Sequence, residues 1–154
     1  MSPKLTAEQR HEFMARFKST GTIPEVTLRH LLRRAGFVGY RLNVRSLPGK
    51  PDIAYTRWRV AVFTDGEWWH GHPDFFQAGT KGEYWDAKIA RNQKRDRAAD
   101  AALVAGGWRV VRLWSRDVSR EPQRAVTEVV AALDKAGHPF AHRSLQAHLD
   151  RRSA

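Results

Sequence analysis

The stretch RVAVFTDGEWWHGHPDFF, residues 59–76, joins a strand-like apolar run to acidic, aromatic and histidine side chains. The run at 59–63 is typical of a strand that is buried in a sheet. It ends at Thr64, Asp65 and Glu67, just before a pair of tryptophans. A buried strand that ends in carboxylates predicts a functional site at the edge of the sheet.

Further strand patterns lie on both sides of this stretch. The segments YRLNV (40–44), PDIAY (51–55) and RVAVF (59–63) predict three consecutive strands that pair as an antiparallel meander. A helical pattern over about 83–105 separates the third of them from WRVVRLW at 108–114. Such a crossover predicts that those two strands are parallel.

Helix signals complete an α/β domain with the element order α-β-β-β-α-β-α over residues 1–154. Thr6 and Gln9 form a capping box for a first helix at about 7–17. Thr22, Pro24 and Glu25 begin a second helix, which Gly36 ends. An amphipathic pattern predicts a helix at 121–136, and a polar tail, partly helical, follows at 137–154. We expect a central mixed β-sheet flanked by helices.

The charge of the chain favours a polyanionic partner. Lys and Arg total 27 against 16 Asp and Glu, a formal net charge of +11. A generally arginine-rich proteome is the alternative explanation. Nucleic acid is favoured because basic residues cluster at 29–34 and 88–97 with tryptophans between them. Binding to a membrane surface is less favoured, since no basic amphipathic helix has an apolar face free of core packing.

Composition also excludes several classes of protein. The chain has no cysteine, so it has neither disulfides nor thiolate metal ligands. No segment has the length and apolarity of a membrane span, and the N-terminal sequence lacks the apolar region of a signal peptide. The sequence therefore predicts a cytoplasmic protein.

Two acids at strand ends predict a metal site. Asp52 opens one expected strand and Asp65 follows the end of the next, so antiparallel pairing brings them to one point of the sheet edge. Carboxylates gathered there without a balancing lysine repel each other unless a divalent cation such as Mg²⁺ lies between them. The alternative is structural: Asp52 would cap a turn, and Asp65-Gly66 would be a loop.

The helix at 83–105 carries a further acid on its buried face. Helical spacing aligns Asp96 and Asn92 with the apolar residues of the core-facing stripe: Trp85, Ile89, Ala99 and Leu103. A half-buried carboxylate there needs a partner. That partner is either an arginine, in a structural salt bridge, or a catalytic histidine that Asp96 orients. Separately, His70 and His72 lie two residues apart close to the clustered acids, where a histidine is more often functional than structural.

With these residues identified, the sequence resembles the very short patch repair (Vsr) endonuclease family, a branch of the PD-(D/E)XK nuclease superfamily. The resemblance covers about residues 8–118 and implies a restriction-endonuclease-like fold. The matching blocks are FMARFKSTGTIPEVTLRHLLRRAGF, SLPGKPDIAY, RVAVFTDGEWWHGHP, EYWDAKIARNQKRDR and GWRVVRLW.

The resemblance implies roles for the acids and the histidine. Asp52 matches the metal-binding acid, and Thr64 the residue whose backbone carbonyl also touches the metal. Asp65 stands near the scissile phosphate, where it would hold a second metal or a water. His70 matches the catalytic histidine. The supporting acids are Asp96, which pairs with that histidine, and Glu25 of the second helix.

The resemblance also implies how DNA is held. Trp68, Trp69 and Trp85 match aromatic side chains that wedge into the duplex beside a T:G mismatch, and Met14 matches a residue inserted from the opposite groove by an N-terminal helix within residues 1–20. Core packing is the alternative for Trp85. At least one of the adjacent Trp68 and Trp69 should be exposed. The basic residues expected on the DNA backbone are Lys50, Lys88, Arg91 and Arg95.

One departure concerns a structural zinc that the family holds through cysteines and a histidine. The matching positions here are Glu67, His72, Asp74 and either Ser115 or Arg116. This set is weak in ligand type, so we expect no structural zinc and a salt bridge or packing in its place. The change leaves mismatch specificity open.

These observations predict a Mg²⁺-dependent DNA endonuclease, with Mn²⁺ as a substitute, that nicks T:G-mismatched double-stranded DNA. Mismatch-repair proteins, DNA methyltransferases or restriction enzymes are candidate partners. An alternative is a restriction- or defence-associated nuclease without mismatch specificity. Another is a DNA-binding module with an inactive site, which the presence of Asp52, His70 and Asp96 disfavours.

Overall fold

The computed structural model describes Thr6, Gln9 and residues 20–153. The predicted capping box is present, because the Thr6 N–H donates to Gln9 Oε1 at 2.9 Å and the Gln9 N–H donates to Thr6 Oγ1 at 3.2 Å. The rest of the expected helix at 7–17, including Met14, lies outside the described residues.

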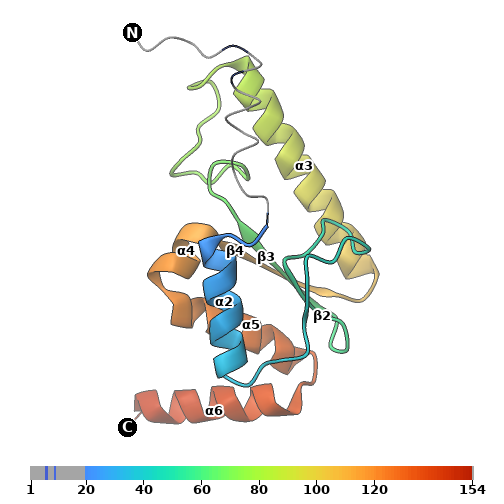
Figure 1. Cartoon of the computed structure of the whole chain (residues 1–154), viewed down its shortest axis with the longest axis vertical. Coiled ribbons are helices and arrows are strands. Elements are labelled where there is room, and N and C mark those ends of the chain that lie inside the picture. Colours follow the sequence, from blue (N-terminus) through green and yellow to red (C-terminus); the bar gives the residue numbers. More distant parts are fainter. Residues whose placement is uncertain (1–5, 7–8, 10–19, 154) are drawn as a thin grey trace.

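A four-stranded mixed sheet forms the centre of the molecule (Figure 1). Its strands, in the spatial order β1-β2-β3-β4, are β1 (Arg41–Leu42), β2 (Ile53–Tyr55), β3 (Val60–Asp65) and β4 (Arg109–Trp114). β1, β2 and β3 pair antiparallel, whereas β3 and β4 pair parallel. Both the meander and the parallel crossover are as the sequence predicts.

Strand boundaries differ from the predicted ones at two places that matter for the site. β1 ends at Leu42 because Asn43 adopts a left-handed backbone conformation, with φ of 48°. β3 continues through Thr64 to Asp65, so Asp65 is the last residue of the strand and does not lie beyond it. The whole of β3 pairs with β4, from Val60 opposite Arg109 to Asp65 opposite Trp114.

Helices cover both faces of the sheet. The long α3 (Glu83–Ala105) lies on one side and extends beyond the sheet, while α2 (Ile23–Arg34), α4 (Ser115–Arg120) and α5 (Pro122–Lys135) gather on the other (Figure 1). α6 (Pro139–Ser153) packs against α5. The sequence did not predict α4, which follows β4 directly and fills the interval before α5.

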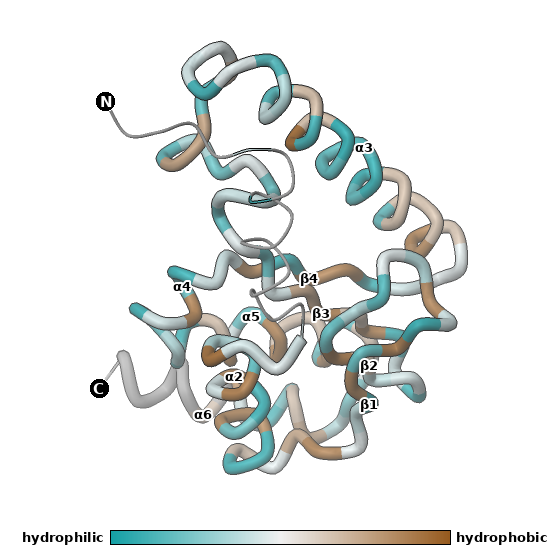
Figure 2. The backbone as a smooth tube through the Cα atoms, turned by 45° about the horizontal axis from the view of Figure 1, so that its top comes forward, coloured by the Kyte–Doolittle hydropathy of each residue, from teal (hydrophilic) through white to brown (hydrophobic). Residues whose placement is uncertain are grey.

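Alternation along β3 divides its side chains between two apolar clusters. Val60 and Val62 face the larger cluster with α2, α4 and α5, whereas Ala61 and Phe63 face the smaller one with Leu103 of α3. The apolar segments concentrate around the sheet and its helical layer, while much of α3 is polar (Figure 2). Within the described residues, no helix is long and apolar enough to span a bilayer.

Candidate active site

Asp52 and Asp65 lie on the same face of the sheet. Ala54 and Ala61 are directly paired across β2 and β3, so their side chains share a face. Side chains alternate between the two faces along a strand, so residues an even number of positions apart share a face. Asp52 is two residues before Ala54, and Asp65 is four residues after Ala61. Both acids therefore point toward the side of α3. Asp52 also accepts a 2.7 Å hydrogen bond from the Thr64 N–H, which ties it to the end of β3.

The Asp52 carboxyl lies where nearby negative charge outweighs nearby positive charge. Burial raises its pKa from 3.8 to about 7; the Thr64 hydrogen bond opposes this rise, and the charges of Glu25 and Asp65 add to it. Such a carboxyl is stabilised in its ionised form by a nearby cation.

Glu25 is buried near the start of α2, with 8% of its surface exposed. Its carboxylate accepts a hydrogen bond from the Gly21 N–H at 2.8 Å and another from the Thr22 hydroxyl at 3.1 Å. The predicted capping box is therefore altered, because Thr22 makes no side-chain cap to the helix and Glu25 reaches one residue further back. These contacts fix a negative charge close enough to raise the pKa of Asp52.

His70 and Asp96 form a close pair across the site. The distance from His70 Nδ1 to Asp96 Oδ2 is 2.5 Å. The loop that carries His70 is fixed to α3 through Asn92, whose Nδ2 donates to the Trp69 carbonyl at 2.9 Å, and Gln93, whose Nε2 donates to the His70 carbonyl at 3.4 Å. The polar positions on the buried face of α3 therefore hold the histidine and its loop.

The two acids beside His70 control its protonation. Burial alone would lower the pKa of the His70 imidazole, but the Asp96 hydrogen bond and the charges of Asp65 and Asp96 outweigh burial and raise it. Burial would raise the pKa of Asp96, but its hydrogen bond to His70 and the nearby positive charges lower it. The pair is therefore strongest when His70 is protonated and Asp96 is ionised.

Asp65 has a basic partner that the sequence prediction missed. Arg112 Nη1 lies 3.0 Å from Asp65 Oδ1 and 2.9 Å from Asp65 Oδ2. The prediction from sequence noted no balancing lysine beside these acids and did not consider an arginine, which for Asp65 supplies the balancing charge. The signal was present in the strand WRVVRLW, where Arg112 is a charged residue in a buried parallel strand.

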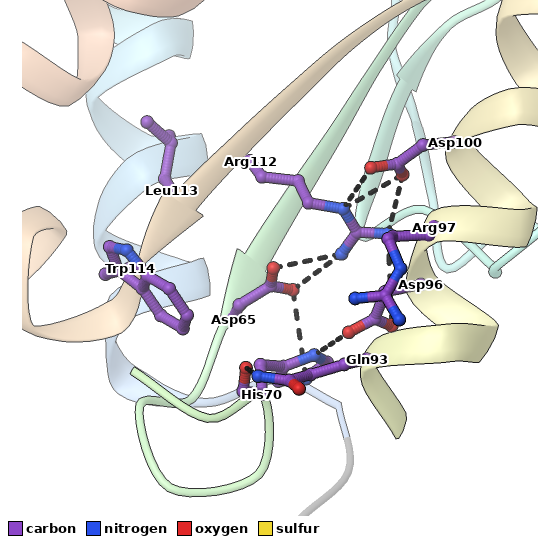
Figure 3. A pocket seen from close by; sticks show the side chains of 9 residues that line it. All are labelled: Asp65, His70, Gln93, Asp96, Arg97, Asp100, Arg112, Leu113 and Trp114. Atoms are coloured by element: carbon purple, nitrogen blue, oxygen red, sulfur yellow. Dashed lines mark hydrogen bonds and ion pairs between the residues drawn. The ribbon is translucent and has the colours of Figure 1, made fainter. Parts of the chain in front are cut away.

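Asp65, His70, Asp96 and Arg112 line a common cavity of about 240 Å³ beside α3 (Figure 3). Since a water occupies about 30 Å³ of liquid, the cavity has room for a phosphate group with several waters. Its remaining lining residues are Gln93, Arg97, Asp100, Leu113 and Trp114.

The residues present fit a hydrated Mg²⁺. Among the described residues, no three acidic or histidine side chains form a ready-made metal cage. Mg²⁺ needs no such cage, because it keeps several waters and is usually bound by one or two carboxylates and by substrate phosphates. The half-buried Asp52, with the negative charges of Glu25 and Asp65 nearby, supplies this kind of donor. The Thr64 hydroxyl beside it is buried without a hydrogen-bond partner.

The three tryptophans form one aromatic cluster. Trp85 packs against Trp68 at 5.5 Å and against Trp69 at 6.1 Å between ring centroids, and Trp68 also meets Phe76 at 5.8 Å. Trp68 and Trp69 are both half-buried, so the expectation that one of them is exposed is wrong. Trp85 packs on these loop tryptophans and is not part of either apolar cluster of the sheet.

A polar network occupies the positions that correspond to the family's zinc ligands. Glu67 accepts a hydrogen bond from the Arg116 N–H, and the Arg116 guanidinium lies 3.6 Å from the Asp74 carboxylate. The His72 ring packs on Trp114 with centroids 4.6 Å apart. The predicted salt bridge and packing contacts at these positions are therefore present.

Basic residues on α3 lie beside the site. Lys88 Nζ is 5.8 Å from the Trp69 ring, and Arg95 Nη2 donates to Asn92 Oδ1 at 2.9 Å. Arg91 is exposed on the same helix. Lys50 belongs to the loop before Asp52 and has a left-handed φ of 54°. Their roles in DNA binding remain predictions.

Comparisons with known proteins place the chain in a family. A family profile described as DNA mismatch endonuclease Vsr matches residues 2–75. The type II nicking enzyme V.NmeDIP of Neisseria meningitidis serogroup C is 43% identical over 139 residues, covering 87% of this chain and 93% of that protein. The type II nicking enzyme V.HpaIIP of Haemophilus parainfluenzae is 38% identical over 134 residues, covering 84% and 94%.

The DNA mismatch endonuclease Vsr of Escherichia coli K12 is 35% identical over 107 residues, which cover 68% of each chain. Identity at this level over most of the chain is enough to establish the family. The α/β architecture, with its four-stranded mixed sheet between helices, is compatible with a restriction-endonuclease-like fold. This chain belongs to the Vsr family of DNA endonucleases.

Proposed function

We propose that this protein is a Mg²⁺-dependent DNA nickase that cuts duplex DNA beside a T:G mismatch. The observation that carries the proposal is the His70–Asp96 pair, 2.5 Å apart, on the same side of the sheet as the half-buried Asp52. An acid for a metal and an oriented histidine for a proton are the groups that phosphodiester hydrolysis needs.

Asp52 and the Thr64 carbonyl would hold the ion, which when bound polarises the phosphate and stabilises its developing charge. His70 would take a proton from the attacking water through Nε2. Asp96 fixes the tautomer by accepting the Nδ1 proton and stabilises the imidazolium that results. Because its two acidic neighbours raise the pKa of His70, the histidine is a stronger base than free imidazole.

The aromatic cluster supports recognition of a mismatch. Trp85 packs on both Trp68 and Trp69, which directly precede His70, so the cluster offers large apolar rings near the site that could insert between base pairs. Unstacking costs a few kcal/mol and costs least at a mispaired step. The names of several relatives, type II nicking enzymes, favour nicking of one strand.

The test compares otherwise identical labelled duplexes with a T:G or a T:A pair, incubated with Mg²⁺ or with EDTA. We expect one strand of the T:G duplex to be cut with Mg²⁺, and no cutting with EDTA or with Asp52→Ala. Equal cutting of both duplexes would contradict mismatch specificity and favour a restriction- or defence-associated nuclease. Cutting by Asp52→Ala at the wild-type rate would show that the site is wrong.

A further inference from the structure

Arg112 lies among three acids and an aromatic ring. Its Nη1 contacts both oxygens of Asp65, at 3.0 and 2.9 Å, and its Nε contacts both oxygens of Asp100, at 2.9 and 3.0 Å. Its Nη2 lies 2.8 Å from Asp100 and 4.0 Å from Asp96. The guanidinium carbon is 4.1 Å from the centroid of the Phe63 ring, which is its neighbour across β3 and β4.

This environment fixes the orientation of Asp65. Only 7% of Asp65 is exposed, and Figure 3 shows its carboxylate between the Arg112 guanidinium and the His70 ring. The distance from Asp65 Oδ1 to His70 Nε2 is 3.8 Å, on the opposite side of the ring from Asp96. The planar fork of the guanidinium, Nε and Nη2, binds Asp100, and this fixes the direction in which Nη1 meets the Asp65 carboxylate.

Asp52 and Asp65 therefore differ in what surrounds them. The Asp52 carboxyl accepts a hydrogen bond from a backbone N–H, and the negative charges of Glu25 and Asp65 near it outweigh the positive charge of His70. Both oxygens of Asp65 are already bonded to a guanidinium. A metal that took Asp65 as a ligand would have to share these oxygens with the positively charged Arg112, which is itself held by Asp100.

We propose that Arg112 is a positioning residue that keeps Asp65 out of the metal's coordination shell and aims it at His70 Nε2. This inference rests on the proposed nuclease site. It assigns Asp65 the role of orienting His70 and its water, in place of binding a second metal. Asp52 is then the carboxylate ligand of the ion, and Asp65 is not.

The first test measures binding of Mn²⁺ by electron paramagnetic resonance, without DNA, in wild type, Asp52→Asn and Asp65→Asn. We expect Asp52→Asn to lose the bound Mn²⁺ and Asp65→Asn to bind it with wild-type affinity. Loss of Mn²⁺ binding in both variants would overturn the inference. Because this readout does not require cutting, it stays decisive even if the wild-type protein cuts no DNA and the proposed function fails.

The second test measures single-strand cutting by Arg112→Met and Arg112→Lys. We expect Arg112→Met to lower kcat by about 10–100-fold with KM for DNA unchanged, the usual loss when a supporting partner is removed. Arg112→Lys should recover part of this loss, since it keeps the charge without the fork. The matched control is Arg109→Met on the same strand, whose side chain bonds the Lys135 carbonyl and should leave kcat unchanged.

Other outcomes would contradict the positioning role. A higher KM with unchanged kcat in Arg112→Met would make Arg112 a DNA contact. A lower thermal midpoint with wild-type kcat for the folded protein would make it a structural residue only. Because Arg112→Met can fail to fold, Arg112→Lys and Asp65→Asn keep the inference testable.

Discussion

At the residue scale, burial and neighbouring charge give similar side chains different roles. Asp52, Asp65 and Asp96 are all acids around one site, yet the structure gives each a different partner. Asp52 is bound by a backbone N–H, Asp65 by Arg112 and Asp96 by His70. Burial raises the pKa of Asp52, whereas the contact with His70 and nearby positive charge lower that of Asp96, so the same residue type can serve a metal in one place and a histidine in another.

Asp52 should destabilise the metal-free protein at neutral and alkaline pH. Burial raises its pKa to about 7 in the folded protein, against 3.8 ordinarily, so the unfolded chain ionises first as the pH rises. Its contribution to stability therefore falls between about pH 4 and about pH 7 and is constant above that range. Asp52→Asn should raise the free energy of unfolding at pH 8 by roughly 1–3 kcal/mol, discounted for partial solvent screening.

The measurement is urea denaturation in EDTA at pH 5 and pH 8 for wild type and Asp52→Asn. The difference between the two proteins should be larger at pH 8, and adding Mg²⁺ should stabilise the wild type alone. An equal pH dependence in both proteins would show that the Asp52 carboxyl is not perturbed.

Asp96 should act on catalysis through His70. Asp96→Asn removes the ionised acceptor at His70 Nδ1, so we expect kcat to fall by about 10²–10⁴-fold with little change in KM for DNA. The pKa of His70 should fall, because the Asp96 contact raises it, and the acid limb of the kcat–pH profile should move to lower pH. Rates measured from pH 5 to 9 check both effects.

The control for this variant lies on the same helix. Asp86 accepts hydrogen bonds from the Gly79 N–H at 3.1 and 3.0 Å and does not contact His70. Asp86→Asn should therefore keep the wild-type pH profile. A similar shift in both variants would attribute the effect to the charge of α3 as a whole.

At the element scale, the loop between β3 and α3 carries His70 and the tryptophans, and α3 holds the loop in place. α3 bonds the loop at Trp69 and His70 through three side chains: the adjacent Asn92 and Gln93, and Asp96 one turn later. The loop also approaches the helix closely at Gly71, where a Cβ would lie 2.3 Å from Gln93 Nε2 and 2.8 Å from Ile89 Cγ2. Rigid contact between loop and helix therefore positions the histidine.

Gly71→Ala and Gly79→Ala form a matched pair that tests this contact. Both glycines have left-handed backbones, with φ of 70° and 85°, so both alanines cost about 1 kcal/mol of backbone strain. At Gly79 nothing lies within 4 Å of an added Cβ, whereas at Gly71 it overlaps α3. We expect Gly71→Ala to lose roughly 1–3 kcal/mol more stability and to lower kcat, because His70 is displaced.

Thermal unfolding and single-turnover cutting measure the two effects. Equal losses of stability and unchanged kcat in both variants would show that the loop can move away from α3 without harm to the site.

At the scale of the whole molecule, the apolar core and the site lie on different faces of the sheet. The larger apolar cluster lies with α2, α4 and α5, and the cavity with its acids lies on the side of α3. Basic side chains on α3 add to a net charge of +11 for the chain. The protein can therefore present its polar face to DNA while the opposite layer supplies stability.

This charge predicts steeply salt-dependent DNA binding. If the protein neutralises 6–10 phosphates, affinity should fall by about 10³–10⁵-fold between roughly 50 mM and 200 mM salt. Lys88→Ala on α3 should reduce the slope of log K against log salt by about 1. Arg124→Ala on α5 should leave the slope unchanged, since Arg124 is paired with Glu121 and Glu128. Fluorescence anisotropy with a labelled duplex measures each slope, and a similar effect of both variants would rule out α3 as the DNA-facing helix.

Much of the architecture followed from local patterns. The strands, the long helix and the parallel crossover were predictable because burial periodicity and connection length restrict how neighbouring segments can pair. The buried stripe of α3 likewise predicted that Asp96 needs a partner. Strand ends were less predictable, because the left-handed Asn43 that stops β1 leaves no clear mark in the hydrophobic pattern.

The sequence by itself determined the α/β order, the positive charge and the three residues Asp52, His70 and Asp96 around which a site could form. Tertiary structure alone decided that Arg112, 47 residues from Asp65 along the chain, binds that acid, and that Trp68 and Trp69 are both half-buried against Trp85. The reason is physical: periodicity specifies which face of an element is buried, but the partner of a buried charge depends on the register and packing of elements that are distant in sequence.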